Sequence, residues 1–278
     1  MSGFSPEWLA VREPVDHRSR DLALAGLVAG RMQPRPEPQI VDLGCGTGSN
    51  LRATAPLLGP KQRWTLVDYD PRLLAAARER LTAWAEKAEP RDEGLLLRKA
   101  GREIAVRFKQ ADLVADLDGA LGEAPALVTA SALFDLCSVD FIGKLAAAVA
   151  RRRALFYTVL TYDGVQTWTP EHPADADMRA AFIAHQKTDK GFGISAGPDA
   201  PSVMKAAFES HGYAVREADT PWRMAESDAP LVRDLAAGFA GAVAETGKVD
   251  TATIAAWRAV VRTGAVVGHT DTLALPPG

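Results

Sequence analysis

A glycine-rich turn directly after a short apolar run is the feature that most constrains the fold of this chain. Residues 39–50 read QIVDLGCGTGSN and place Gly44, Gly46 and Gly48 in one turn. The run before the turn is typical of a buried parallel strand, and a helical pattern begins at Asn50. Glycines let a backbone bend sharply and approach a ligand closely because they lack a Cβ atom. The following helix offers free N–H groups and the positive end of its dipole, so the stretch predicts a ligand-binding loop.

A second strand with an acid at its end supports this interpretation. Residues 63–68 read RWTLVD, and Pro71 then opens a helical pattern. Asp68 lies about where the acid after the next strand reaches a ribose hydroxyl in nucleotide-binding βαβ units. A glycine turn alone is also compatible with a plain tight loop, but the two elements together are far more specific.

The sequences VDLGCGTG and LVDYDP resemble the first two motifs of the class I S-adenosylmethionine-dependent methyltransferases. Dinucleotide dehydrogenases are the nearest alternative and prefer G-x-G-x-x-G, whereas Ser49 stands here in place of the last glycine. Asp42, two residues before the first glycine, also suits the methyltransferase pattern better. The resemblance implies a Rossmann-like α/β fold with a seven-stranded, mostly parallel sheet and helices on both faces. Its last strand, 264–275, is then antiparallel between the fifth and sixth strands.

The resemblance also implies S-adenosyl-L-methionine as the cofactor and assigns residues to it. The glycines of the turn admit the cofactor, Asp68 binds both ribose hydroxyls, and Asp112 with Leu113 holds the adenine. Ser131 faces the methionine part, and an acid such as Asp42 is tolerated because this ligand carries no phosphate. The cofactor-binding candidates are Asp42, Gly44, Gly46, Gly48, Asp68, Tyr69, Asp112, Leu113 and Ser131.

We expect two regions, an N-terminal helical segment at 1–38 and a methyltransferase domain at 39–278. Helices are predicted at 5–13 and from Asp16 to about Met32. In the resembled family such a segment commonly covers the cofactor cleft, so Arg12, Arg18 or Arg20 is expected to meet the cofactor's carboxylate or the substrate. Plain solvated helix charges are the alternative for each arginine.

The methyl acceptor is expected under a cap insertion at 165–200, which follows a fifth strand predicted at 154–162. Loops at the carboxyl ends of parallel strands form the ligand crevice of such sheets. His185 is the first candidate for a general base and Asp135 the second, whereas a carboxylate acceptor needs no base and is then positioned by Lys190 or an arginine. The substrate-binding candidates are Tyr162, Trp168, Lys190 and Phe192.

Bulk properties narrow the classes of function. The chain has 278 residues, a net charge of −3 and two cysteines, which offer no disulfide framework. A slightly acidic chain has no general attraction to nucleic-acid backbones or anionic membranes. The first residues contain acids and no apolar core of signal-peptide length, and no apolar run approaches roughly 20 residues. We expect a cytoplasmic protein without a membrane partner or a metal site.

The sequence therefore predicts a methyltransferase that acts on a small-molecule metabolite by O- or N-methylation. An RNA or protein methyltransferase is the alternative enzyme, since basic residues cluster at 98–109 and 151–153. A non-catalytic cofactor-binding module of the same fold is the alternative outside the enzymes. A DNA-base substrate is not expected, because the fourth-strand segment lacks an asparagine- or aspartate-proline-proline-aromatic signature and Cys137 follows leucine instead of proline. The acceptor and the oligomeric state stay open.

Overall fold

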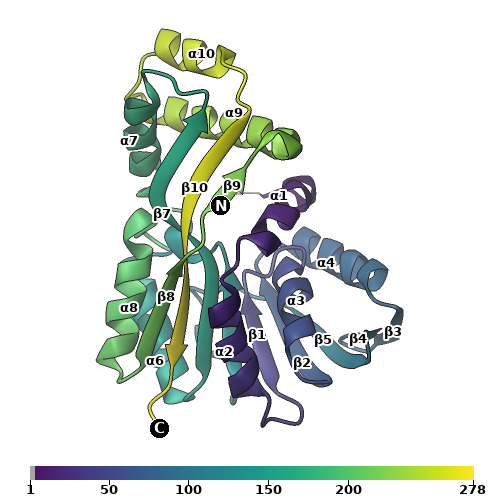
Figure 1. Ribbon diagram of the computed structural model, residues 1–278. Helices are drawn as coiled ribbons and strands as arrows, with labels where there is room; N and C mark the ends of the chain where they lie inside the picture. The colour runs from purple at the N-terminus through teal and green to yellow at the C-terminus, as the bar shows by residue number, and fades with distance from the viewer. Residues whose placement is uncertain (1–3) are drawn as a thin grey trace.

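One sheet runs through the molecule, with the strand of the glycine loop near its middle (Figure 1). The computed structural model describes residues 4–278. Within them, ten strands form the sheet in the order β3-β4-β5-β2-β1-β6-β7-β10-β8, and β9 pairs with β10 off this path. The strands are β1 (Gln39–Leu43), β2 (Lys61–Asp68), β3 (Lys87–Arg91), β4 (Gly94–Lys99), β5 (Arg102–Gln110), β6 (Leu127–Ser131), β7 (Leu155–Thr169), β8 (Ala214–Asp219), β9 (Trp222–Met224) and β10 (Gly264–Leu275).

The strand directions confirm the predicted Rossmann-like α/β fold. β1 is parallel to β2 and β6, β2 is parallel to β5, and β6 is parallel to β7. β10 lies antiparallel between β7 and β8, as the resemblance implied. The sheet exceeds the seven predicted strands because β3 and β4 extend one edge and β9 pairs with the first residues of β10. The carboxyl ends of the parallel strands meet at the glycine loop, where such sheets bind ligands.

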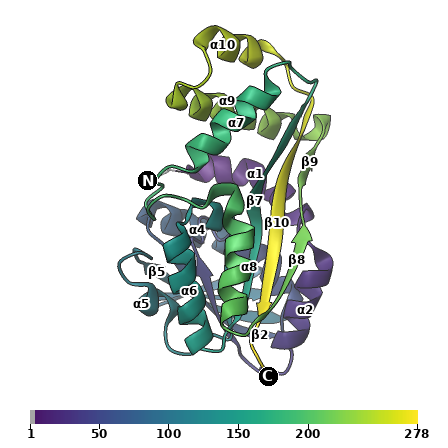
Figure 2. The same ribbon diagram turned by 90° about the vertical axis from the view of Figure 1, so that its left-hand side faces the viewer.

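Helices cover both faces of the sheet, and each face has its own apolar core (Figure 2). Leu24, Leu51 and Leu81 from α2, α3 and α4 belong to one core, and Phe141 and Phe208 from α6 and α8 belong to the other. No helix in the described part of the chain is both long and apolar enough to cross a membrane. The helices are α1 (Pro6–Arg18), α2 (Leu22–Met32), α3 (Ser49–Thr54), α4 (Pro71–Trp84), α5 (Leu117–Leu121), α6 (Val139–Arg151), α7 (Asp175–Gln186), α8 (Ala200–Ser210), α9 (Ala229–Thr246) and α10 (Thr251–Ala259), with 3₁₀ turns η1 (Ala55–Leu57), η2 (Phe134–Leu136), η3 (Gly197–Asp199) and η4 (Glu226–Asp228).

The segment before the sheet folds into two helices, with a boundary that differs from the prediction. The second helix begins at Leu22 and not at Asp16, because the Asp21 carboxylate accepts a hydrogen bond from the Leu24 N–H at 2.6 Å. A side-chain acceptor at this position satisfies a backbone donor that the first turn leaves unpaired. The first helix, α1, therefore continues through Arg18 into the stretch that was predicted for the second helix. It lies over the glycine loop, with the Leu9 side chain against Gly46.

The cap is built differently from the predicted insertion. The fifth strand does not end at Tyr162 but continues through Thr169, because residues 166–169 pair with the start of β10. Figure 1 shows β7 and β10 rising together beyond the rest of the sheet, with α7, α9 and α10 around their far end. Only α7 comes from the predicted stretch 165–200, and α9 and α10 come from 229–259. The cap therefore combines two segments that the strand pair holds together.

Candidate functional site

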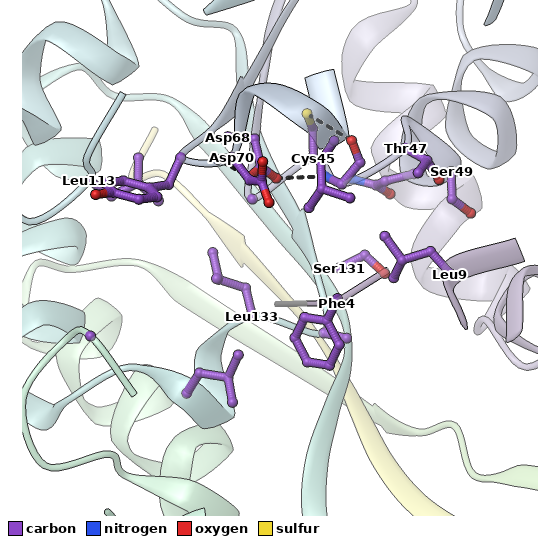
Figure 3. Close-up of a pocket in the computed structure, with 18 of the residues that line it drawn as sticks. Phe4, Leu9, Cys45, Thr47, Ser49, Asp68, Asp70, Leu113, Ser131 and Leu133 are labelled. Atoms are coloured by element: carbon purple, nitrogen blue, oxygen red, sulfur yellow. Dashed lines mark hydrogen bonds between the residues drawn. The ribbon is translucent and has the colours of Figure 1, made fainter. Parts of the chain in front are cut away.

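A cavity of about 500 Å³ lies where β1, β2 and β6 end, and the glycine loop forms part of its wall. A cavity of this size is typical of small-molecule sites, which span roughly 300–1,000 Å³. Figure 3 shows Leu113, Asp68 and the loop residue Cys45 along one side, with Leu133 and Phe4 facing them across the space. Strand ends and α1 thus enclose one site.

Two of the three loop glycines line this cavity. Gly44 and Gly46 have φ angles of +61° and +54°, which L-residues rarely adopt. An added Cβ would lie 3.2 Å from the Leu133 side chain at Gly44 and 3.1 Å from the Leu9 side chain at Gly46. Gly48 does not line the cavity, because it is the N-cap of α3. The bare backbone at the first two glycines leaves room for close approach by a ligand.

Asp68 lines the cavity and also holds the glycine loop in place. Its Oδ2 accepts a hydrogen bond from the Gly46 N–H at 2.8 Å, and its Oδ1 accepts one from the Asp70 N–H at 3.0 Å. A carboxylate offers about four acceptor positions, so two remain for ligand hydroxyls. Burial raises the pKa of Asp68, although these backbone hydrogen bonds lower it. Asp70, which the sequence analysis did not single out, lines the same wall.

The far end of the cavity carries the residues predicted for adenine. Asp112 Oδ1 accepts from the Val114 N–H at 2.8 Å, while no hydrogen bond within the described residues engages its Oδ2. Leu113 is buried beside it, and the half-exposed Tyr69 side chain also lines the cavity. A free carboxylate oxygen next to an apolar side chain suits an amino-bearing planar ring.

Asp42 does not line the cavity, which corrects its predicted contact with the cofactor. Its side chain is fully buried, and its Oδ1 accepts from the Asn50 amide at 2.8 Å. Arg20 donates to the Asn50 Oδ1 at 2.9 Å, so a buried chain of polar groups fixes α3 against β1. Burial raises the pKa of Asp42 to about 7. Asp42 therefore contacts Asn50 of the helix that follows the glycine loop, and does not contact the cavity.

The segment after β6 forms the wall that faces the predicted methyl-donor end. Ser131, Leu133 and Leu136 line the cavity. Asp135, which stands between the two leucines in sequence, is buried and does not line the cavity itself. The Asp135 Oδ1 has no hydrogen-bond partner within the described residues. Burial raises its pKa to about 6, which is a suitable value for a group that accepts a proton near neutral pH.

The structure separates the four predicted substrate residues. Lys190 and Phe192 line the cavity, and the Phe192 ring meets the Phe141 ring edge-on at 4.8 Å. Trp168 does not line it, because its alternating position on β7 directs it into the cap core against Phe239 and Trp257. Tyr162 is buried behind the cavity wall and is absent from the lining.

His185 lies outside the cavity lining, contrary to its predicted place over the crevice. Its Nε2 is 2.9 Å from the Glu245 carboxylate of α9, and the Lys190 Nζ is 3.3 Å from the same nitrogen. His185 is held away from the cavity because α9, which was not predicted to belong to the cap, supplies the Glu245 carboxylate. The contacts tie α7 to α9 and to the loop that carries Lys190.

The three arginines of the N-terminal segment have different surroundings. Arg12 lines the cavity and pairs with Asp16, which the sequence analysis did not single out. Arg18 pairs with Asp228 at the surface, and Arg20 donates a hydrogen bond to Asn50 of α3. Phe4, Leu9 and Leu136 also line the cavity; their apolar character alone carried no signal that separates them from core residues.

Comparisons with known proteins give a family match and a curated relative. A family model described as a methyltransferase domain matches residues 41–121. The biotin biosynthesis bifunctional protein BioCD of Bordetella avium (strain 197N) is 30% identical over an alignment of 180 residues, which covers 58% of this chain and 32% of that protein. The chain therefore spans about a third of the length of the curated relative it matches.

Solved structures share the whole architecture at low identity. A cyclopropane-fatty-acyl-phospholipid synthase-like protein from Lactobacillus casei ATCC 334 has a TM-score of 0.56 and 15% identity, with 98% of this chain and 95% of that chain covered. The cyclopropane synthase MmaA2 from Mycobacterium tuberculosis has a TM-score of 0.52 and 13% identity, with 98% and 94% covered. At these identities, the likeness establishes the common fold.

Proposed function

We propose that this chain, which belongs to the class I S-adenosylmethionine-dependent methyltransferases, transfers a methyl group from that cofactor to a nitrogen or oxygen atom of a small-molecule metabolite. One observation carries the proposal: a single cavity connects the residues suited to the cofactor with an apolar wall suited to an acceptor. Asp68 and Asp112 stand on the first side, and Leu133, Leu136 and Phe192 stand on the second.

The residues present fit the cofactor. Asp68 has acceptor positions left for ribose hydroxyls, and the open oxygen of Asp112 suits the adenine amino group with Leu113 against the ring. The bare backbone at Gly44 and Gly46 admits the part of the ligand that lies closest to the loop. When bound, S-adenosylmethionine supplies an electrophilic methyl group on a positively charged sulfur.

Asp135 is the stronger of the two predicted bases on this geometry. Neither side chain lines the cavity itself. Asp135 belongs to the segment whose Leu133 and Leu136 line it, whereas His185 is engaged with Glu245 in the cap. The bound cofactor would give its methyl group to the acceptor's lone pair and would leave as S-adenosylhomocysteine, and Asp135 would take the proton that the acceptor loses. Leu133 and Leu136 exclude water from this point, and holding the two reactants in line lowers the barrier by several kcal/mol.

The first experiment is a calorimetric titration with S-adenosylhomocysteine, followed by transfer of labelled methyl groups from S-adenosylmethionine to fractionated metabolites. Asp135→Asn is expected to lower kcat by about 10²–10⁴-fold, which is the usual range for loss of a general base. The wild-type rate is expected to fall as the pH drops below about 6, where Asp135 becomes protonated. Asp140→Asn, on the exposed start of α6, is the matched control.

Other outcomes select the alternatives. Loss of turnover in His185→Ala with an unchanged rate in Asp135→Asn would transfer the role of base to His185. Tight binding of S-adenosylhomocysteine without turnover on any fraction would favour a non-catalytic module. An RNA substrate has little support, because several residues of the basic clusters are paired with acids. These pairs are Arg98 with Glu89, Arg107 with Glu93, and Arg152 with Asp118.

A further inference from the structure

Five polar side chains from five separate elements converge beside the wall that carries Leu133 and Leu136. This polar cluster consists of Arg12, Asp135, Tyr162, Trp222 and His269. The Arg12 guanidinium carbon lies 5.1 Å from the Trp222 ring centre, the Trp222 and His269 rings are 5.0 Å apart, and the His269 and Tyr162 rings are 6.4 Å apart. Burial is the main cause of the lowered pKa of His269, and the positive charge of Arg12 is the second cause. Burial raises the pKa of Asp135 and the same charge lowers it, so both side chains lie near the guanidinium.

Four members of the polar cluster are buried and carry a polar atom without a partner in the described residues. These atoms are Asp135 Oδ1, Tyr162 Oη, Trp222 Nε1 and His269 Nδ1. A buried polar atom that no polar group meets destabilises the folded protein, because it has lost its hydrogen bonds to water. Two other buried tryptophans have partners: Trp64 Nε1 donates to Gln62 at 2.8 Å and Trp257 Nε1 donates to Asp175 at 2.6 Å. Four unpartnered atoms in one neighbourhood therefore indicate a polar occupant.

Arg12 connects the polar cluster to the cavity. Its Nε and Nη2 donate to the Asp16 carboxylate at 2.9 and 3.3 Å, while its Nη1 makes no hydrogen bond within the described residues. Arg12 and Asp16 both line the cavity, as do Leu133 and Leu136 on either side of Asp135. A polar ligand bound by the polar cluster would therefore reach the cavity beside the apolar wall, and not at the end near Asp112.

The hydrogen-bonding capacities of the polar cluster define the occupant. Arg12 and the Trp222 indole donate only, the Asp135 carboxylate accepts, and Tyr162 and His269 do either. Burial lowers the pKa of His269 to about 3, so its imidazole is neutral at physiological pH. A matching ligand offers an anionic acceptor to the arginine and the indole, and an N–H or O–H group to the carboxylate.

We infer that the methyl acceptor is a small amino or hydroxy carboxylic acid, with its carboxylate bound by Arg12 and Trp222 and its N–H or O–H group held by Asp135 next to Tyr162 and His269. This inference rests on the proposed function, because it places the acceptor where the polar cluster adjoins the same cavity. The lining of that cavity includes Arg12 but not the other four members of the polar cluster. The inference adds a substrate class and three recognition residues, Arg12, Trp222 and His269.

The test uses the full chain saturated with S-adenosylhomocysteine and titrated calorimetrically with β-alanine, anthranilic acid and salicylic acid, each against its carboxamide. We expect at least one acid to bind about tenfold to hundredfold more tightly than its amide, which is the effect of one charged hydrogen bond. Arg12→Gln should abolish this preference, and Trp222→Phe, which deletes the N–H group but keeps a ring, should reduce it. Arg18→Gln on the same helix is the control that keeps it.

The outcomes separate the two proposals. If S-adenosylhomocysteine itself fails to bind, the proposed function is wrong. If it binds and every amide binds as well as its acid, or no acid binds, the inferred substrate class is wrong while the cofactor site stands. An acid preference that persists in both Arg12→Gln and Trp222→Phe would overturn the assigned recognition residues.

Discussion

Replacement of Asp68 by asparagine tests the cofactor site most directly. The carboxylate accepts from the Gly46 N–H at 2.8 Å and from the Asp70 N–H at 3.0 Å. An amide has one oxygen, so one of these donors must face an NH₂ group, and a ribose hydroxyl loses a charged acceptor. Loss of one charged hydrogen bond costs roughly 1.5–3 kcal/mol. The Kd for S-adenosylhomocysteine should therefore rise about tenfold to hundredfold.

The readout for this variant is binding, measured by calorimetric titration. Burial raises the pKa of Asp68, so removing its charge offsets part of the lost hydrogen bonding and stability changes little. Asp118→Asn is a suitable control, because that carboxylate is exposed and pairs with arginines that do not line the cavity. Wild-type affinity in a folded Asp68→Asn protein would refute the assignment of this carboxylate to the ribose.

Three further changes test the loop, its support and the cap. Burial raises the pKa of Asp42 to about 7, so its contribution to stability is complete below about pH 4 and is lost as the pH rises through 7. The free energy of unfolding in urea should therefore fall less between pH 5 and 8 in Asp42→Asn than in the wild type, by about 2–3 kcal/mol. Gly46→Ala should weaken S-adenosylhomocysteine binding, since a positive φ costs an alanine about 1–2 kcal/mol and its Cβ meets Leu9, whereas Gly101→Ala has similar strain in open space and should bind normally. Trp168→Ala should lower the unfolding free energy by about 3–5 kcal/mol, while Trp168→Phe should leave acceptor KM unchanged; a raised KM in Trp168→Phe would restore its predicted substrate role.

The cofactor half of the site was accessible from sequence because its signals are local. A strand, a turn that needs positive φ angles and a helix occupy consecutive residues, and the acid that follows the next strand is read in the same way. Of the nine predicted cofactor residues, Asp42 and Gly48 do not line the cavity. They have the same residue types as residues that line the cavity, and only their position in three dimensions distinguishes them.

The cap was predicted less well because long-range pairing determines it. Residues 163–169 carry turn-like and polar residues, yet they are a strand because 264–267 pair with them about a hundred positions later. That pairing turns Trp168 toward the cap core and recruits α9, whose Glu245 then engages His185. No local pattern contains this information.

The amino-acid sequence by itself determined the α/β class, the glycine loop and the neighbouring acid, since each depends on backbone conformations and spacings within a few residues. The tertiary structure decided which polar side chains share the acceptor side of the cavity. Arg12 and His269 stand 257 positions apart in the chain. Only the packing of α1 against β9, which pairs with β10, brings both side chains to the Trp222 ring.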